Sequence, residues 1–386
     1  MKTDKLGVGK SVIEIVIQAP PLSINVVNND VVLKTTSYAY YKYFITSILA
    51  NFHAGYFRIS LSLCAQVLLW NTLVRFTKER HDRDQIKSPT TLASALPSTA
   101  STLLWCIALA VLLVLSLLYV LRCLLHFDKV KAEFLDDVGV NYLFAPSISS
   151  LFLLQSSPFN HSIHLEQVAC FVCVMPIIML DIKIYGQWFT KGKRYLSKMA
   201  NPTCQMSVIA NLVAAKVAMY IGWAEMSLCL FSLGMVHYLV LFVTLYQRLP
   251  ESNGVSHLLR PVFFLFFATP SMASLAWSSI NGTFDHFSKM LFFLSVFLFL
   301  SLICRPNMFK KSMKKMNIAW WAYSFPLTLL ALSSIHYADA VNHGFARAFA
   351  FALSVVSVLV SLSLMLLTSF NFNLLFLDTQ PASNLS

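Results

Sequence analysis

The chain has 386 residues, of which 57% are hydrophobic and only 12% are charged, and its mean hydropathy is +0.66. Soluble domains carry roughly 25% charged residues, so this chain cannot cover its surface with polar groups, and lipid must replace water over much of it. The net charge is +12, but the basic residues cluster at the ends of apolar runs, where they would face an anionic leaflet. No basic patch with interleaved aromatic residues occurs, which argues against nucleic-acid binding.

Residues 1–50 are polar and predict a cytosolic N-terminal tail, residues 51–370 a transmembrane domain, and residues 371–386 a short cytosolic C-terminal tail. The first apolar stretch is too short for a secretory signal, so we expect the first membrane span to direct insertion. The run Gly9-Lys10-Ser11 matches the end of a phosphate-binding loop. Asp4 stands where that loop needs a glycine, and we reject this interpretation.

Beyond residue 50, apolar runs long enough to cross about 30 Å of hydrocarbon recur. They predict an all-α integral membrane protein with ten spans, near 54–74, 101–124, 140–157, 166–184, 203–221, 225–247, 261–281, 288–304, 318–337 and 345–370. Most lysine and arginine residues lie on one side if both termini are cytosolic, which is therefore the predicted orientation. The basic loop 75–100 is the exception. Asn160 and Asn281 begin glycosylation acceptor patterns and fall at or in predicted outer loops.

The acidic residues bear on the chemistry that the spans can support. None lies near the middle of a predicted span, and Asp181 is placed at the end of one. Carriers coupled to protons or sodium need carboxylates within the membrane. His237 and His336 stand isolated, and no cluster for a metal or pairing of nucleophile with base occurs. We therefore predict no cofactor, no metal and no enzymatic activity.

Three prolines, Pro146, Pro270 and Pro326, fall inside the third, seventh and ninth spans. A proline frees the carbonyl four residues earlier from its helical hydrogen bond. Kinked odd-numbered spans around an axis would make a central pore, in which hydroxyls and freed backbone groups stabilise anions. The alternative is that these prolines are simply tolerated, and Pro176 also interrupts the even-numbered fourth span.

Two further side chains are candidates for such a pore. Phe325 directly precedes Pro326, and a bulky ring at a kink can plug a narrow path. Arg58 lies near the start of the first span, where it either reaches the cytosolic interface or faces the pore and attracts anions. We add Gly55 and Thr328 as pore-lining candidates.

Several long segments resemble the plant slow-type (S-type) anion channel family. They are FHAGYFR at 52–58, DIKIYGQW at 181–188, NPTCQ at 201–205, HY at 237–238 with FVTLYQRLP at 242–250, and NIAWWAYSFP at 317–326. The resemblance covers roughly residues 50 to 370. It is strongest to the short-tailed homologues of the guard-cell channel, and it extends to bacterial tellurite-resistance and dicarboxylate transporters.

The resemblance implies ten helices in five hairpins with quasi-five-fold symmetry, and odd-numbered helices around a central pore that a phenylalanine, here Phe325, occludes. It also implies trimers, passage of chloride and nitrate across the plasma membrane, and control by kinases. Two departures from the family pattern bear on the implied conduction and kinase control. The resemblance implies a glycine where Arg58 stands, and the tails here are short. The alternatives are therefore an electrically silent subunit that modifies a related channel in a mixed trimer, and a carrier of organic acids such as malate.

Overall fold

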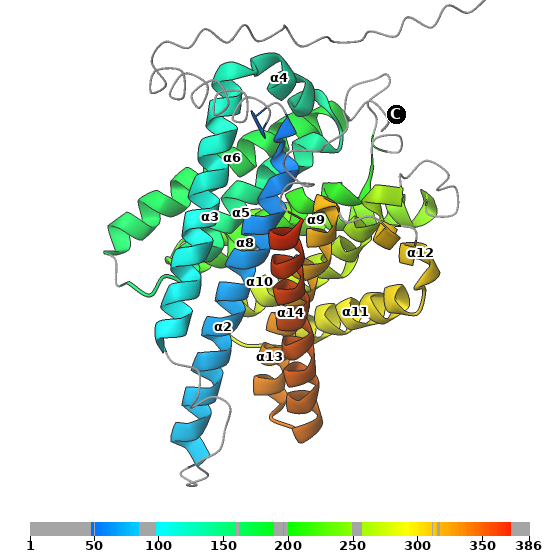
Figure 1. Ribbon diagram of the computed structural model, residues 1–386. Coiled ribbons are helices and arrows are strands. Elements are labelled where there is room, and N and C mark those ends of the chain that lie inside the picture. Colours follow the sequence, from blue (N-terminus) through cyan, green and yellow to red (C-terminus); the bar gives the residue numbers. More distant parts are fainter. Residues whose placement is uncertain are drawn as a thin grey trace, which may run out of the picture. The chain divides into compact units, whose positions relative to one another are not determined.

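The described residues form an all-helical assembly in which no strand occurs (Figure 1). The computed structural model describes residues 48–49, 51–84, 98–159, 162–188, 196, 200–248, 257–310, 312–314 and 317–371. They belong to one unit that begins at Ser47. Apart from residues 48, 49 and 371, both predicted tails lie outside the described residues, as does Asn160.

Ten of the described helices pair as five hairpins, each with an inner helix followed by an outer helix. The pairs are α2 (Phe57–Asp84) with α3 (Ser98–Leu125), α5 (Phe144–Gln155) with α6 (Ile163–Trp188), α8 (Gln205–Tyr220) with α9 (Ala224–Arg248), α10 (Leu265–Asn281) with α11 (His286–Ile303), and α13 (Trp321–Val341) with α14 (Gly344–Phe370). Short segments join some of them: α4 (Phe127–Leu135), α12 (Asn307–Lys310) and the 3-10 turn η6 (Ser312–Lys314).

The inner helices form a closed ring. α2 packs on α5, α5 on α8, α8 on α10, α10 on α13, and α13 again on α2. In the apolar stretches of α2, α10 and α13, 72%, 78% and 89% of the residues are buried, against 17% to 39% in the outer helices. The outer helices expose large apolar side chains such as Leu117, Val172 and Leu359, which suit a lipid environment. This arrangement confirms the predicted helical membrane fold.

The predicted number of ten spans is not fully supported by helix length and composition. Among the described residues, eight helices are long and apolar enough to cross a membrane, and up to nine if α4 and the segment Gly139–Gln155, bent by 106°, count as one span. The inner helix α8 has 16 residues and α5 only 12. Both are packed between other helices, so burial within the protein supports them where length does not.

A 3-10 turn precedes every inner helix: η1 (Ala54–Tyr56), η2 (Gly139–Leu143), η3 (Pro202–Cys204), η5 (His257–Phe264) and η7 (Ile318–Trp320). These turns contact one another in the same cyclic order as the helices they precede. All five inner helices therefore begin at one end of the ring, which we name the proximal end, and finish at the distal end. Figure 1 shows α4 near the start of α2, and the turn between α13 and α14 at the opposite end.

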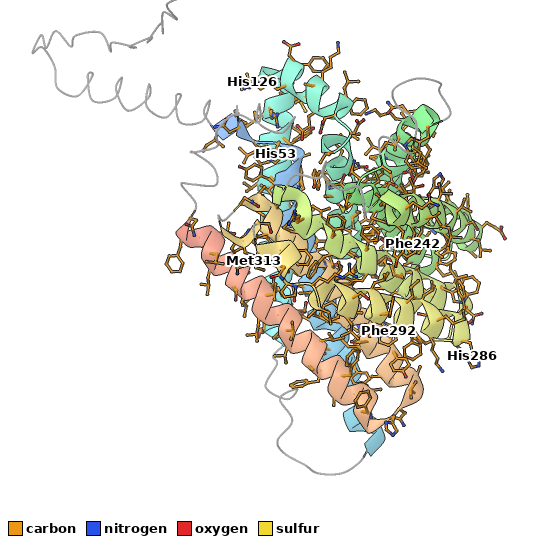
Figure 2. The ribbon with its side chains drawn as sticks, turned by 90° about the vertical axis from the view of Figure 1, so that its right-hand side faces the viewer. His53, His126, Phe242, His286, Phe292 and Met313 are labelled. Carbon is orange, nitrogen blue, oxygen red and sulfur yellow. The ribbon has the colours of Figure 1, made fainter. Side chains whose placement is uncertain are left out.

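Three of the five turns begin with the same cap. His53, Asn201 and Asn317 have extended backbones (φ −145°, −139° and −147°), and each side chain accepts a hydrogen bond from the N–H two residues later. Such caps satisfy backbone donors that have no partner within the helix. The chain thus contains a structural repeat at its proximal end, where Figure 2 shows His53 close to His126.

Candidate functional site

A small cavity lies where the proximal parts of the inner helices converge. Its volume of about 20 Å³ has room for about one water molecule. All five inner helices or the turns before them contribute to its wall: Arg58, Leu61, Tyr142, Met206, Val262, Leu265, Trp321, Ala322 and Phe325. We call it the central cavity. Of the residues predicted for a pore, Arg58 and Phe325 meet there.

Phe325 contacts a second aromatic residue across the interior of the ring. The ring centroids of Phe325 on α13 and Phe152 on α5 are 6.2 Å apart. These helices are not neighbours in the inner ring, so the contact spans its interior. Both side chains are buried, with exposures of 2% and 0%. Sequence reasoning missed Phe152, because nothing in its surroundings distinguishes it among 31 phenylalanines.

Arg58 is a buried cation, with 7% of its surface exposed. Its guanidinium carbon lies 3.9 Å from the ring centroid of Tyr142, a cation–π contact. Its Nε and Nη1 have no hydrogen-bond partner, and no carboxylate among the described residues pairs with it. Burying a charge without a counter-ion is costly. A small anion in the central cavity would supply the missing charge.

Gly55 is required by the conformation of the cap at the start of η1. A Cβ atom at this position would lie 2.6 Å and 2.7 Å from the Cε1 and Nδ1 atoms of His53. The Nδ1 atom of His53 accepts the Gly55 N–H at 3.1 Å. Gly55 therefore lets the cap close beside Arg58, and it is not among the residues that line the central cavity.

Thr328 lies one helical turn beyond Phe325, where three helices meet. Its hydroxyl donates to the carbonyl of Ser324 at 2.9 Å and accepts from the amide of Gln66 on α2 at 2.9 Å. Gln66 also donates to the hydroxyl of Ser357 on α14 at 2.9 Å. These contacts connect α2, α13 and α14, so the Thr328 hydroxyl is engaged between helices.

The three predicted prolines all lie on inner helices. Pro270 and Pro326 are inside α10 and α13, and Pro326 follows Phe325 directly. Pro146 lies in the first turn of α5, directly after η2, where α5 is bent sharply from α4. Pro176 is inside the outer helix α6.

A hydrogen-bonded ion pair fixes the proximal end of α2. Glu133 on α4 accepts the Ala54 N–H at 2.5 Å and pairs with Arg122 on α3 at 3.1 Å. Nearby, burial and the charges of Arg58 and Arg122 lower the pKa of His53 to about 3. His53 is therefore neutral at physiological pH, as its acceptor role toward Gly55 requires.

The structure corrects one expectation about charged groups. Asp181 is not at the end of its span, because α6 continues to Trp188, and its buried carboxylate accepts from the Asn211 amide at 2.7 Å. The charges of Lys216 and Asp339 act on His336, which belongs to no group of residues that could hold a metal in the described part of the chain. Asn281 is the exposed last residue of α10, and its amide donates to Thr283 and Asp285, both at 3.2 Å.

These features define a helical membrane protein whose inner helices enclose a small cavity lined by a buried cation, Arg58. The chain belongs to the voltage-dependent anion channel family, whose family model matches residues 51–369. It is 58% identical to the S-type anion channel SLAH1 of Arabidopsis thaliana over 77% of this chain and 75% of that protein. It is 40% identical to the guard cell S-type anion channel SLAC1 of the same plant, over 78% of this chain and 52% of that protein.

A more distant relative is the tellurite resistance protein TehA homolog of Haemophilus influenzae. It is 24% identical over 75% of this chain and 81% of that protein. The matches to plant and bacterial relatives confirm the resemblance seen in the segments between residues 50 and 370.

Proposed function

We propose that this protein is a passive S-type anion channel that passes chloride and nitrate across a plasma membrane and is closed by Phe325 against Phe152. The observation that carries the proposal is the contact of these two rings across the interior of the ring of inner helices, beside the central cavity. A rotation of either side chain about χ1 would widen the passage without moving a helix.

The choice of anions as the permeant ions rests on charge. Arg58 lines the central cavity and lacks a carboxylate partner among the described residues, and no acidic residue lines that cavity. At an effective dielectric constant near 20, a unit anion 4 Å from the guanidinium gains about 4 kcal/mol, and a cation loses as much. Arg58 therefore attracts anions and excludes cations at the narrowest region.

We extend the proposal to orientation and assembly. The proximal end faces the cytosol and both termini are cytosolic, in accord with the distribution of basic residues. The channel assembles as a trimer, either of identical copies or with related channel subunits, and kinases regulate it. Membership of a family that includes S-type anion channels supports this extension.

Two-electrode recording from oocytes tests the proposed function, with chloride, nitrate or malate as the permeant anion. Phe325→Ala is expected to give a larger chloride and nitrate current than the unchanged protein. Phe351→Ala is the matched control, because Phe351 is 55% exposed on α14, the outer partner of α13. An unaltered current from Phe325→Ala protein shown to be at the cell surface would contradict the gate.

The same recordings decide between the channel and its alternatives. Flux of malate that depends on a proton gradient would indicate an organic-acid carrier. Absence of current alone, together with changed current or selectivity of a co-expressed long-tailed relative, would indicate a modifying subunit.

A further inference from the structure

A second buried cation lies in the distal half of the ring of inner helices. Lys216 on α8 is 8% exposed, and its Nζ atom donates to the Oε1 atom of Gln155 at 3.1 Å. Gln155 is the last residue of α5. Among the described residues, no carboxylate forms an ion pair with Lys216. Its ammonium group thus has one neutral acceptor, although it carries three donor hydrogens.

Lys216 lies where α8 packs on its ring neighbour α5, and its contact with Gln155 joins these two inner helices. The charges of Arg75 on α2 and of His336 on α13 also interact with the Lys216 charge. Asp339, the other charged group that acts on His336, is exposed near the end of α13.

Lys216 and Arg58 lie on opposite sides of the contact between Phe152 and Phe325. His336 follows Phe325 by eleven residues on α13, which is about three turns and about 16 Å toward the distal end. Because three turns are a nearly whole number, His336 lies on the same face of α13 as Phe325. Gln155 likewise follows Phe152 by about one turn on α5. The group around Lys216 is therefore distal to the closure, and Arg58 is proximal to it.

A buried ammonium without a counter-ion costs several kcal/mol, and the neutral side chain of Gln155 does not offset its charge. Passages that conduct ions need more than one site of moderate affinity, so that an ion that enters can also leave. Both considerations favour a small anion beside Lys216.

We infer that Lys216, positioned by Gln155, forms a second binding site for a small monovalent anion, on the distal side of the proposed closure. The inference rests on the proposed function in so far as the ring interior is the anion path. Binding at this site does not itself require conduction, so the two can fail separately.

The test is the melting temperature of the purified full-length protein in lipid nanodiscs. Sodium chloride replaces sodium gluconate at constant ionic strength, and Arg58→Met removes the proximal cation from the background. The chloride-dependent rise in melting temperature is expected to persist in Arg58→Met and to disappear in Arg58→Met/Lys216→Met. A ligand at one hundred times its dissociation constant stabilises by about 2.7 kcal/mol, which is readily resolved.

The control replaces a lysine at the distal end outside the ring. Lys289 is in the first turn of the outer helix α11, three residues after His286, which Figure 2 labels. Arg58→Met/Lys289→Met should retain the full chloride-dependent rise. If Arg58→Met alone shows no rise, or if the rise survives Lys216→Met, the second site is excluded.

A measurement on the unchanged protein covers a failure of Lys216→Met to fold. Anomalous scattering from bromide should give a peak within hydrogen-bonding distance of Lys216 Nζ, and its absence would overturn the inference. Oocyte currents separate this outcome from the proposed function. Current through Phe325→Ala without Lys216-dependent stabilisation refutes only the second site, whereas stabilisation without any current refutes only the channel.

Discussion

Phe152 and Phe325 touch across the interior of the inner ring, with centroids 6.2 Å apart, although they belong to α5 and α13, which are not neighbours. In the proposed channel, the closure therefore depends on two side chains from different hairpins. Movement of either hairpin, or rotation of either ring, would then be enough to change the width of the passage.

Phe152→Ala is predicted to raise the anion current in the same direction as Phe325→Ala. Each substitution removes one half of a single contact, so the double substitution should raise the current by less than the product of the two single effects. Surface-normalised oocyte currents from the four proteins measure this coupling. Strict multiplication of the two effects would mean that the rings act independently.

Arg58→Met is predicted to weaken anion occupancy of the central cavity about tenfold or more, since the charge contributes about 4 kcal/mol at 4 Å and an effective dielectric constant near 20. In the Phe325→Ala background, the chloride concentration for half-maximal current should rise accordingly. Arg58→Lys retains the charge and is the control. Equal half-saturation in the Met and Lys variants would remove Arg58 from the anion path.

Gly55→Ala is predicted to destabilise the protein by about 1–2 kcal/mol, because its Cβ would lie 2.6 Å from the His53 ring and displace the cap. Gly186→Ala on α6 is the matched control, since nothing lies within 4 Å of a Cβ there, and alanine favours a helix. Thermal unfolding in nanodiscs compares the two variants. Similar melting temperatures would show that the cap tolerates the methyl group.

His53 gives a prediction about pH. Its pKa falls from 6.5 to about 3 on folding, through burial and the charges of Arg58 and Arg122. Folding therefore favours the neutral ring, and this contribution is complete above pH 6.5 and is lost as the pH falls toward 3. Between pH 7.5 and 5, the unchanged protein should lose up to about 2 kcal/mol through His53.

His53→Asn should lack this component of the pH dependence while keeping the cap, because Asn201 and Asn317 make the same hydrogen bond at η3 and η7. Melting temperatures at pH 7.5 and 5 for both proteins test it. Parallel losses of stability would show that His53 does not titrate in this range.

Much of the fold followed from apolar runs and motifs, because lipid-facing and core helices both need long apolar stretches. The outer helices match the predicted spans within a few residues at most of their ends, as α14 does at Gly344–Phe370. The predicted span 140–157 corresponds to a 3-10 turn, η2, followed by the short inner helix α5, a division that the sequence did not indicate. A helix that is buried among other helices is stabilised by contacts distant in the sequence, and neither its length nor its composition reports them.

The candidate site was predictable only in part. Arg58 could be picked out because a cation is rare in a membrane span. Phe325 was identified because the segment around it resembles the S-type anion channel family and because Pro326 follows it. Phe152 could not be identified from the sequence. The order of the inner helices around the ring decides which residues of α5 face α13, and no local sequence pattern encodes that order. The cap shared by His53, Asn201 and Asn317 escaped notice for another reason: His53 differs in residue type, and the repeat lies in the backbone.

The common starting point of the five inner helices gives the passage an electrical direction. Each helix N-terminus carries a partial positive charge of roughly half an elementary charge, and all five gather at the mouth where η1, η2, η3, η5 and η7 touch. The antiparallel outer helices place their opposite poles on the perimeter, farther from the axis. Anions in the proposed passage would therefore meet a macrodipole field that differs between the two mouths, and an open passage should rectify.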